Sequence, residues 1–264
     1  MKGIILAGGM GSRLAPLTKV TNKHLLPIYN RPMIYYPIMK LIELGVDHIL
    51  LVSGKGHAGH FLELLGGGSE FGVNFSYEVQ EEAGGIAQAL ALAEDFVRDE
   101  KFVVMLGDNI YEDNLLPAVK EFIQSDNKAH VFLKEVENPS SYGVARFEDD
   151  NIVEIIEKPV NPPSNYAVTG CYLFTPDVFD VIRTLKPSDR GELEISHVND
   201  KYVKDSAMGC TKLSGYWGDC GESIDKNMEV STYVQKHAHV WNSEQEKGTL
   251  NEVQEQPIES RDFA

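Results

Sequence analysis

The sequence has few cysteines and no long apolar run, and each absence excludes a class of protein. Its 264 residues include three cysteines, Cys171, Cys210 and Cys220, with no Cys-x-x-Cys pair. An odd, widely spaced set argues against a disulfide framework and a zinc site, so cytoplasmic localisation is the expected default. No apolar segment approaches the length of a membrane span, and we therefore expect no membrane partner.

Positive charge is also scarce. The chain has 24 Lys and Arg against 40 Asp and Glu, which gives a formal net charge of −16. A protein this acidic lacks the positive field of a nucleic-acid binder, so no nucleic acid polymer is expected as a partner. A phosphate-bearing ligand would have to be held by local cations, backbone amides or a metal ion.

Short buried strands alternate with helical segments through the first half of the chain. Residues 3–7 form an apolar run that ends in glycines, which is typical of a buried strand and is too short for a signal peptide. The same patterns predict strands at 48–52, 74–79 and 101–106, and helices at 32–44, 58–65 and 85–97. This alternation predicts an α/β fold with a Rossmann-like mixed, mostly parallel sheet flanked by helices.

The second half has a different pattern. Residues 142–147 and 152–156 alternate around an acidic turn and predict an inserted β-hairpin. A strand is then expected at 167–174, and helices at 176–185, 193–204 and 222–236. Because there is no repeat or clear linker, we expect one domain over residues 1–241, followed by a polar tail over 242–264.

A glycine-rich loop follows the first strand. Residues 8–13 read GGMGSR, and Lys23 comes ten residues later. Glycines allow backbone N–H groups to approach a triphosphate closely, and Arg13 and Lys23 add positive charge. The alternative is a tight strand-to-helix turn with two surface cations. The loop fits neither the P-loop pattern nor the dinucleotide fingerprint, in which Leu14 would have to be a glycine.

Polar residues also follow two further predicted strands. Gln80 follows the strand at 74–79 and Asp108 the strand at 101–106, so both are expected near the glycine loop at one edge of the sheet. The amide of Gln80 can pair with a base edge, although a strand-end glutamine is the ordinary alternative. Asp108 suits either a metal ligand or a helix N-cap. A second acid, Asp219, lies 111 residues further on, between glycines.

The order of these motifs resembles the sugar nucleotidylyltransferase family over residues 1–236, and it is nearest to the short-form glucose-1-phosphate thymidylyltransferases. The resemblance is carried by residues 8–14, 16–18, 23–27 and 31–37, and by Gln80, Asp108, the Glu157-Lys158-Pro159 segment and Asp219. It implies a nucleotide-diphospho-sugar transferase fold. The nucleotide-binding part would cover about residues 1–110 and the sugar-phosphate-binding part about 111–241.

The resemblance also implies roles for individual residues. The catalytic residues would be Arg13, Lys23, Asp108, Lys158 and Asp219. The nucleotide would be bound by Leu6, Ala7, Gly8, Gly9, Gly11, Ser12, Arg13, Gln80 and Gly85. The sugar phosphate would be bound by Asn109, Tyr142, Gly143, Glu157, Lys158, Val168, Gly170 and Tyr172. Asp108 and Asp219 would hold Mg²⁺ as cofactor, and the protein would be a homo-oligomer, either a dimer or a tetramer.

The implied partners are a nucleoside triphosphate and a sugar-1-phosphate. An oxygen of glucose-1-phosphate would attack the α-phosphorus of dTTP in line, giving dTDP-glucose and pyrophosphate for deoxysugar or polysaccharide precursor synthesis. Open alternatives are the same reaction with UTP, CTP or GTP or with another sugar-1-phosphate, and a non-catalytic sensor of nucleotide sugars. An NAD-dependent oxidoreductase is disfavoured by the failed glycine fingerprint.

Three features depart from the family pattern. Asn22 stands where many relatives have proline before the lysine, which changes loop stiffness more than charge. Cys220 replaces a common threonine in the turn after Asp219. Residues 242–264 do not resemble the helical segment that forms a regulatory nucleotide site in longer members, so allosteric feedback is not expected.

Overall fold

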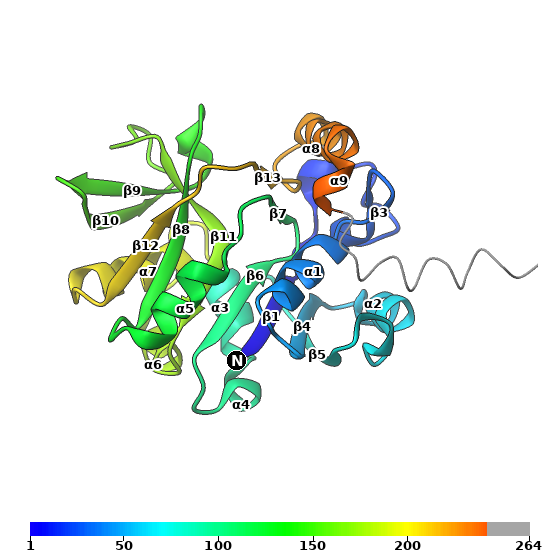
Figure 1. The fold of residues 1–264 in the computed structure, drawn as a ribbon, viewed down its shortest axis with the longest axis horizontal. Coiled ribbons are helices and arrows are strands. Elements are labelled where there is room, and N and C mark those ends of the chain that lie inside the picture. Colours follow the sequence, from blue (N-terminus) through cyan, green and yellow to red (C-terminus); the bar gives the residue numbers. More distant parts are fainter. Residues whose placement is uncertain (242–264) are drawn as a thin grey trace, which may run out of the picture.

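A computed structural model describes residues 1–241, and the expected polar tail at 242–264 lies outside the described residues. A nine-stranded sheet has the order β10-β9-β11-β6-β1-β4-β5, with β8 beside β11 and β12 beside β8 (Figure 1). Its parallel part consists of β1 (Lys2–Ala7), β4 (His48–Gly54), β5 (Asn74–Gln80) and β6 (Phe102–Leu106). The remaining strands are β8 (Ala129–Glu135), β9 (Gly143–Glu148), β10 (Asn151–Glu157), β11 (Tyr166–Phe174) and β12 (Met208–Lys212). The expected mixed α/β sheet is confirmed.

Helices cover both faces of this sheet because successive side chains of a strand point to opposite faces. Ile4 and Leu6 of β1 pack in one buried cluster, and Ile5 and Ala7 pack in the other. The first cluster is covered by α3 (Ile86–Ala91), α4 (Glu94–Val97), α6 (Val178–Thr184) and α7 (Ile195–Lys204). The second is covered by α1 (Tyr35–Glu43), α2 (Ala58–Leu65) and α5 (Leu116–Gln124). Within residues 1–241, no helix combines the length and the apolar character needed to cross a bilayer.

Some elements differ from the sequence prediction. The helix expected at 85–97 is two short helices, α3 and α4, and the helix expected from residue 32 begins at Tyr35. Its first residue, Pro32, instead belongs to β3 (Arg31–Pro32), which pairs with β2 (Pro27–Ile28). Strands β8 and β12, helix α5 and the short strands β7 (Asn109–Tyr111) and β13 (Trp217–Asp219) were not predicted. Short turns of 3₁₀-helix occur at Ser12–Leu14, Lys23–Leu25, Ser69–Phe71 and Pro139–Ser141.

Strand β11 joins the two parts of the expected single domain. It pairs antiparallel with β6 of the first part and with β8 of the second. Its ladder with β8 is irregular between Val168 and Tyr172, and Gly170 lies in this irregular stretch. A Cβ atom at Gly170 would lie 2.7 Å from the side chain of Leu106, so only glycine allows β11 to approach the end of β6 this closely.

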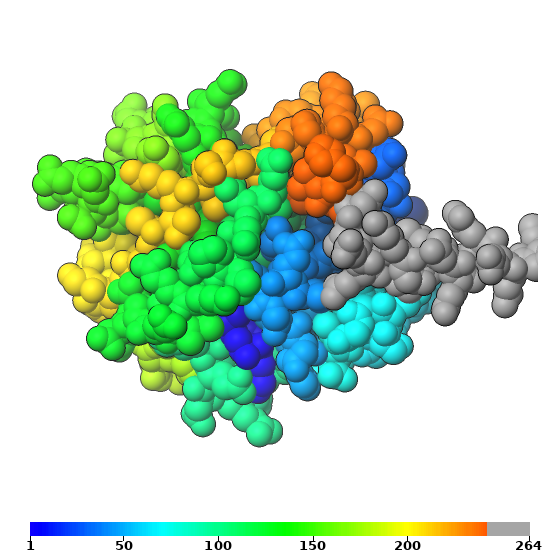
Figure 2. Space-filling view, viewed as in Figure 1, coloured from blue at the N-terminus to red at the C-terminus, as the bar shows by residue number. Residues whose placement is uncertain are grey.

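The C-terminal part of the described chain returns to the N-terminal part. Helix α8 (Ile224–Lys236), followed by α9 (Ala238–Trp241), buries Val230 and Val234 against Ile28 and Met33. Figure 2 shows the orange atoms of α8 and α9 lying beside blue atoms of the N-terminal segment. Just before α8, β13 pairs antiparallel with β7 and places Asp219 opposite Asn109.

The side chain of Asn109 connects these strands. Its Oδ1 accepts hydrogen bonds from the Gly170 backbone N–H of β11 at 3.0 Å and from Trp217 Nε1 of β13 at 2.7 Å. Tyr111 also donates to Oδ1, at 3.3 Å, and Asn109 Nδ2 donates to Asp108 Oδ1 at 3.0 Å. Asn109 is buried, so water does not compete for these bonds. One amide therefore fixes the relative positions of β7, β11 and β13.

We expect Asn109→Leu to lower the free energy of unfolding by about 3 kcal/mol or more, because it leaves buried N–H donors of Gly170 and Trp217 without an acceptor. For a chain of this size the melting temperature would fall by roughly 6–12 °C. Asn74→Leu, at an exposed position of β5, is the control and should change the melting temperature little. Equal melting temperatures for the two variants would contradict this role of Asn109.

Candidate active site

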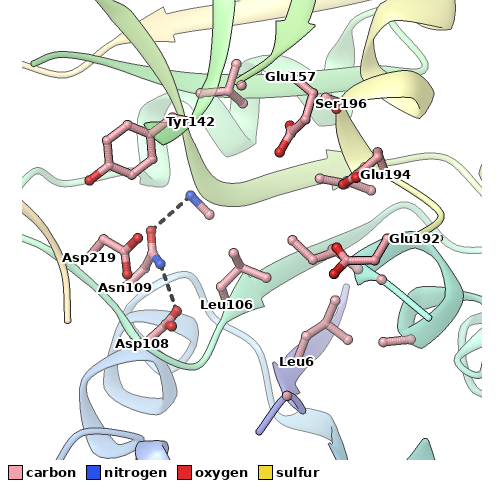
Figure 3. A pocket seen from close by; sticks show the side chains of 18 of the residues that line it. Leu6, Leu106, Asp108, Asn109, Tyr142, Glu157, Glu192, Glu194, Ser196 and Asp219 are labelled. Carbon is pink, nitrogen blue, oxygen red and sulfur yellow. Dashed lines mark hydrogen bonds between the residues drawn. The ribbon is translucent and has the colours of Figure 1, made fainter. Parts of the chain in front are cut away.

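A cleft of about 320 Å³ lies at the carboxyl ends of the parallel strands. Its lining includes residues from the glycine loop, β5, β6, the hairpin β9–β10, β11, β13 and α7. Of the residues predicted from the sequence, the cleft gathers Leu6, Gly8, Gly9, Arg13, Lys23, Gln80, Gly85, Asp108, Asn109, Tyr142, Gly143, Glu157, Lys158, Val168, Gly170, Tyr172 and Asp219. Figure 3 shows Asp108 and Asp219 toward one end, and Glu157, Glu192 and Glu194 toward the other.

Two carboxylates and one ammonium meet at the first end. Lys23 Nζ forms an ion pair with Asp108 Oδ2, and both side chains are largely buried. Pairing of β13 with β7 brings Asp219 to this point, and the backbone N–H of Cys220 donates to the carbonyl of Asp108 at 2.9 Å. Gly221 donates its N–H to Asp219 Oδ1 at 2.9 Å. The two acids that are 111 residues apart in the sequence thus lie in one site.

The two carboxylates differ in acidity. Burial alone would raise the pKa of Asp108, but the neighbouring Lys23 ammonium holds that pKa well below its ordinary value. Burial, together with the negative charge of Asp108, raises the pKa of Asp219 to about 7. Near neutral pH, ionised Asp219 therefore has no nearby positive charge within residues 1–241 that fully offsets its own charge.

This donor set fits a hard divalent cation. Two carboxylates in one cleft match the oxygen ligands that Mg²⁺ uses together with phosphate oxygens and water. Within residues 1–241 there is no cluster of three or more His, Cys, Asp or Glu side chains that could hold a metal ion by itself. A cation here would depend on a bound phosphate for the rest of its ligands.

The glycine loop borders the same end of the cleft. Arg13 lies exposed on the turn at Ser12–Leu14 and lines the cleft. Asn22 caps the turn that carries Lys23: its Oδ1 accepts from the His24 backbone N–H at 2.9 Å, and its Nδ2 donates to the carbonyl of Ala7 at 3.2 Å. The asparagine that departs from the family pattern therefore ties the lysine turn to the end of β1.

Gln80 and Gly85 form another part of the cleft wall. Gln80 is the last residue of β5 and is 7% exposed. Gly85 has φ +101°, in the region that favours glycine, and a Cβ atom there would lie 2.5 Å from the carbonyl oxygen of Leu193. Hydrogen bonds from Leu193 to Gly84 and from Ala87 to Leu193 hold this segment in place.

Basic and acidic side chains interleave at the opposite end. Lys158 follows β10 with φ +41°, an uncommon conformation for a residue with a side chain, and its backbone N–H donates to the carbonyl of Tyr142 at 2.9 Å. The carboxylate of Glu157 lies 3.6 Å from Lys158 Nζ and 3.5 Å from Arg190 Nη1. Arg190 also contacts Glu192 and Glu194, so its guanidinium spans three acids of this end.

The hairpin and β11 complete the walls. Tyr142 packs edge-to-face on Trp217 and donates its hydroxyl to Glu222 Oε2 at 2.6 Å. Burial, reinforced by Glu222, raises the pKa of Tyr142 so that the phenol stays protonated. Val168 and Tyr172 are buried members of β11 that line the cleft. This side of the cleft is therefore apolar, with polar groups at its rim.

Three residues predicted to bind nucleotide are not among those that line the cleft, and their contacts remain predictions. Ala7 is fully buried, Gly11 has a left-handed conformation, and Ser12 begins the turn that carries Arg13. The sequence prediction also missed several lining residues. These are His24, Arg190, Glu192, Glu194, Ser196, Asn199 and Trp217, among others.

Little in the local sequence indicated a functional role for these residues. Arg190 stands among acidic residues in the sequence, and an arginine in that setting usually belongs to a solvated surface. Ser196 and Asn199 are polar positions one turn apart on α7, and both are buried with side-chain atoms that make no hydrogen bond within the described residues. The only indication of their role in the sequence was the presence of two polar residues, three positions apart, on a mostly apolar helix face.

The chain is similar to known proteins of one family. A family model described as Nucleotidyl transferase matches residues 2–237. A glucose-1-phosphate thymidylyltransferase of Actinoplanes sp. is 42% identical over 229 residues, which cover 85% of this chain and 75% of the relative. Another from Neisseria meningitidis is 40% identical over 248 residues, which cover 92% of this chain and 85% of the relative.

Solved structures give the same result. A Bacillus anthracis chain described as a glucose-1-phosphate thymidylyltransferase, solved with sucrose, has a TM-score of 0.85 and 49% identity, covering 88% of this chain and 94% of that one. UDP-glucose pyrophosphorylase bound to UDP-glucose has a TM-score of 0.79 and 28% identity, covering 89% and 98%. The family resemblance is thereby confirmed: the chain belongs to the nucleotidyl transferase family and is a nucleotidyltransferase enzyme.

Proposed function

We propose that the enzyme transfers the thymidylyl group of dTTP to glucose-1-phosphate, forming dTDP-glucose and pyrophosphate with Mg²⁺ as cofactor. The proposal rests on the make-up of one cleft. One end of this cleft holds the carboxylates of Asp108 and Asp219, and the other end holds Lys158, Arg190 and Glu157. The relatives whose names state this activity support the choice of substrates.

The cations of the cleft suit two phosphate-bearing substrates. Arg13 and Lys23, beside the glycine loop, would bind the triphosphate, while Lys158 and Arg190 would bind the phosphate of the sugar phosphate. Guanidinium groups suit this task because their N–H donors match phosphate oxygens in geometry. Glu157 could accept hydrogen bonds from sugar hydroxyls, and Gln80 with Gly85 would contact the nucleobase.

Asp108 and Asp219 would hold Mg²⁺ through carboxylate oxygens, which fits the uncompensated charge of this pair. When bound, the ion would neutralise charge that develops on the phosphate oxygens around the α-phosphorus. Lys23, paired with Asp108, would hold that carboxylate in position and add positive charge beside it.

The chemical step needs positioning more than proton transfer. A phosphate monoester oxygen is already ionised at neutral pH, so the attacking group needs no strong general base. The cleft would align this oxygen with the α-phosphorus and offset the negative charge of both substrates. His24 fits this view, because burial lowers its pKa to about 3 and leaves the ring neutral.

The direct test is pyrophosphate release from glucose-1-phosphate with dTTP, UTP, CTP, GTP or ATP in the presence of Mg²⁺. We expect the highest kcat/KM with dTTP and loss of activity when EDTA removes the metal. Release with another nucleotide as the best substrate would replace dTTP in the proposal. Absence of release with every nucleotide, with galactose- and mannose-1-phosphate included as further acceptors, would contradict it.

We expect Asp108→Asn to lower kcat by at least about a hundredfold, because it removes one proposed metal ligand and the partner of Lys23. The variant should remain folded, which thermal melting would check. Asp126→Asn, at an exposed position outside the cleft, is the matched control and should keep normal turnover. Near-normal kcat for the Asp108 variant would remove this residue from the metal site.

We expect Asp219→Asn to lose turnover yet stabilise the metal-free protein at alkaline pH. With a folded pKa of about 7 against an ordinary 3.8, protonated Asp219 favours the folded state below pH 3.8, and this contribution is lost as the pH rises through 7. Each kcal/mol of this relief would raise the melting temperature at pH 8 by roughly 2–4 °C.

Melting curves in EDTA at pH 5 and pH 8 would measure this effect. The advantage of Asp219→Asn over the parent should be larger at pH 8 than at pH 5, and Mg²⁺ with nucleotide should stabilise the parent more than the variant. A variant that melts below the parent at pH 8 would show that ionised Asp219 does not destabilise the folded protein.

A further inference from the structure

We infer that Gln88 is a positioning residue that fixes which atom of Gln80 faces the nucleobase. The cleft would thereby select bases that carry a ring N–H donor, thymine and uracil, over cytosine. This inference rests on the proposed function and deepens it, since it gives a physical reason for the class of base.

Two backbone groups, one that can only donate and one that can only accept, orient the side-chain amides of Gln88 and Gln80. The Gly84 N–H donates to Gln88 Oε1 at 2.9 Å. Because a backbone N–H can only donate, it fixes the oxygen of the Gln88 amide at this point. That oxygen also lies 2.8 Å from Gln80 Nε2, and the carbonyl of Gly85, which can only accept, lies 3.3 Å from the same nitrogen. The orientation of the Gln80 amide is therefore determined at both contacts.

The consequence is that both N–H groups of the Gln80 side chain are used within the protein. Its Oε1 receives no hydrogen bond from any donor in residues 1–241. This oxygen points toward the glycine loop, since a Cβ atom on Gly8 would lie 2.8 Å from it. Gln80 and Gly8 both line the cleft. The cleft therefore presents a fixed acceptor at this position.

A fixed acceptor discriminates between pyrimidines by whether ring atom N3 carries a proton. Thymine and uracil carry a proton on N3 and can donate to Gln80 Oε1, whereas N3 of neutral cytosine is itself an acceptor. When two acceptors face one another, both lose contact with water and neither gains a hydrogen bond, which costs free energy. A site built to accept a hydrogen bond rejects the analogue that lacks the donor far more strongly than a size difference would.

Gln88 acts only through Gln80 in this scheme. It lies in the first turn of α3 and is not among the residues that line the cleft. A Cβ atom on Gly84 would lie 2.3 Å from Gln88 Nε2, so glycine at 84 allows the amide to reach the backbone. Without Gln88, only the longer contact to Gly85 would oppose rotation of the Gln80 amide.

The test compares dUTP with dCTP, which share the same sugar and lack the 5-methyl group. With the wild-type enzyme and glucose-1-phosphate, kcat/KM should be higher for dUTP. Gln88→Leu removes the acceptor, and we expect the dUTP to dCTP ratio to fall at least about tenfold. Gln88→Glu keeps an oxygen that both the Gly84 N–H and Gln80 Nε2 can use, so its ratio should stay within about twofold of wild type.

An equal loss of activity with both nucleotides in Gln88→Leu would overturn the inference, because a merely structural role lowers both rates without changing their ratio. A Gln88→Glu variant that loses selectivity as fully as the leucine variant would also overturn it. Should the leucine variant fail to fold in thermal melting, Gln88→Met, which matches glutamine in length, takes its place.

Calorimetric binding of dUTP and dCTP with Mg²⁺ gives the same ratio without turnover. A wild-type protein that binds dUTP selectively but releases no pyrophosphate would count against the proposed reaction only. A binding ratio that is unchanged in Gln88→Leu would count against the role of Gln88 only.

Discussion

The hydrogen bonds of Asn109 are the contacts on which the cleft depends. Its amide oxygen holds the N–H groups of Gly170 and Trp217, and its nitrogen holds the carboxylate of Asp108. Gly170 and Trp217 lie on strands that are far from Asn109 in sequence, so loop-closure entropy opposes their meeting. A buried amide with several good bonds offsets that cost and fixes the strands in one arrangement. The position of Asp219 follows from it through the pairing of β13 with β7.

The distribution of charge explains how so acidic a protein can bind phosphates. The net charge is −16, yet the cleft gathers Arg13, Lys23, Lys158 and Arg190. Most of these cations lie beside an acid: Lys23 beside Asp108, and Lys158 and Arg190 near Glu157. Such pairs hold the cations in position before a ligand arrives, which reduces the ordering cost of binding. Burial and the negative charge of Asp108 raise the pKa of Asp219, and this pair of carboxylates is where we propose that a divalent cation binds.

Much of the first half of the fold could be predicted, because buried parallel strands such as β1 and β6 have continuous apolar runs that end in glycine. The short strands β7 and β13 could not, because three residues carry no period and their form depends on pairing with each other. The residues of the site also divide into those that could be predicted from the sequence and those that could not. Gln80 and Asp108 were found from their positions after strands, whereas Arg190 lies in a loop with no pattern that separates it from a surface arginine.

By itself, the sequence determined the α/β class, the glycine loop and the order of motifs that marks the family, since these depend on local periodicity and on residue types at short spacing. Only the tertiary structure decided that Asp108 and Asp219 share one site and that Asn109 joins three strands. It also decided which atom of Gln80 faces the cleft, because backbone groups of Gly84 and Gly85 impose that orientation. Amide orientation and the meeting of distant carboxylates are set by non-local hydrogen bonds, and residue spacing along the chain carries no record of them.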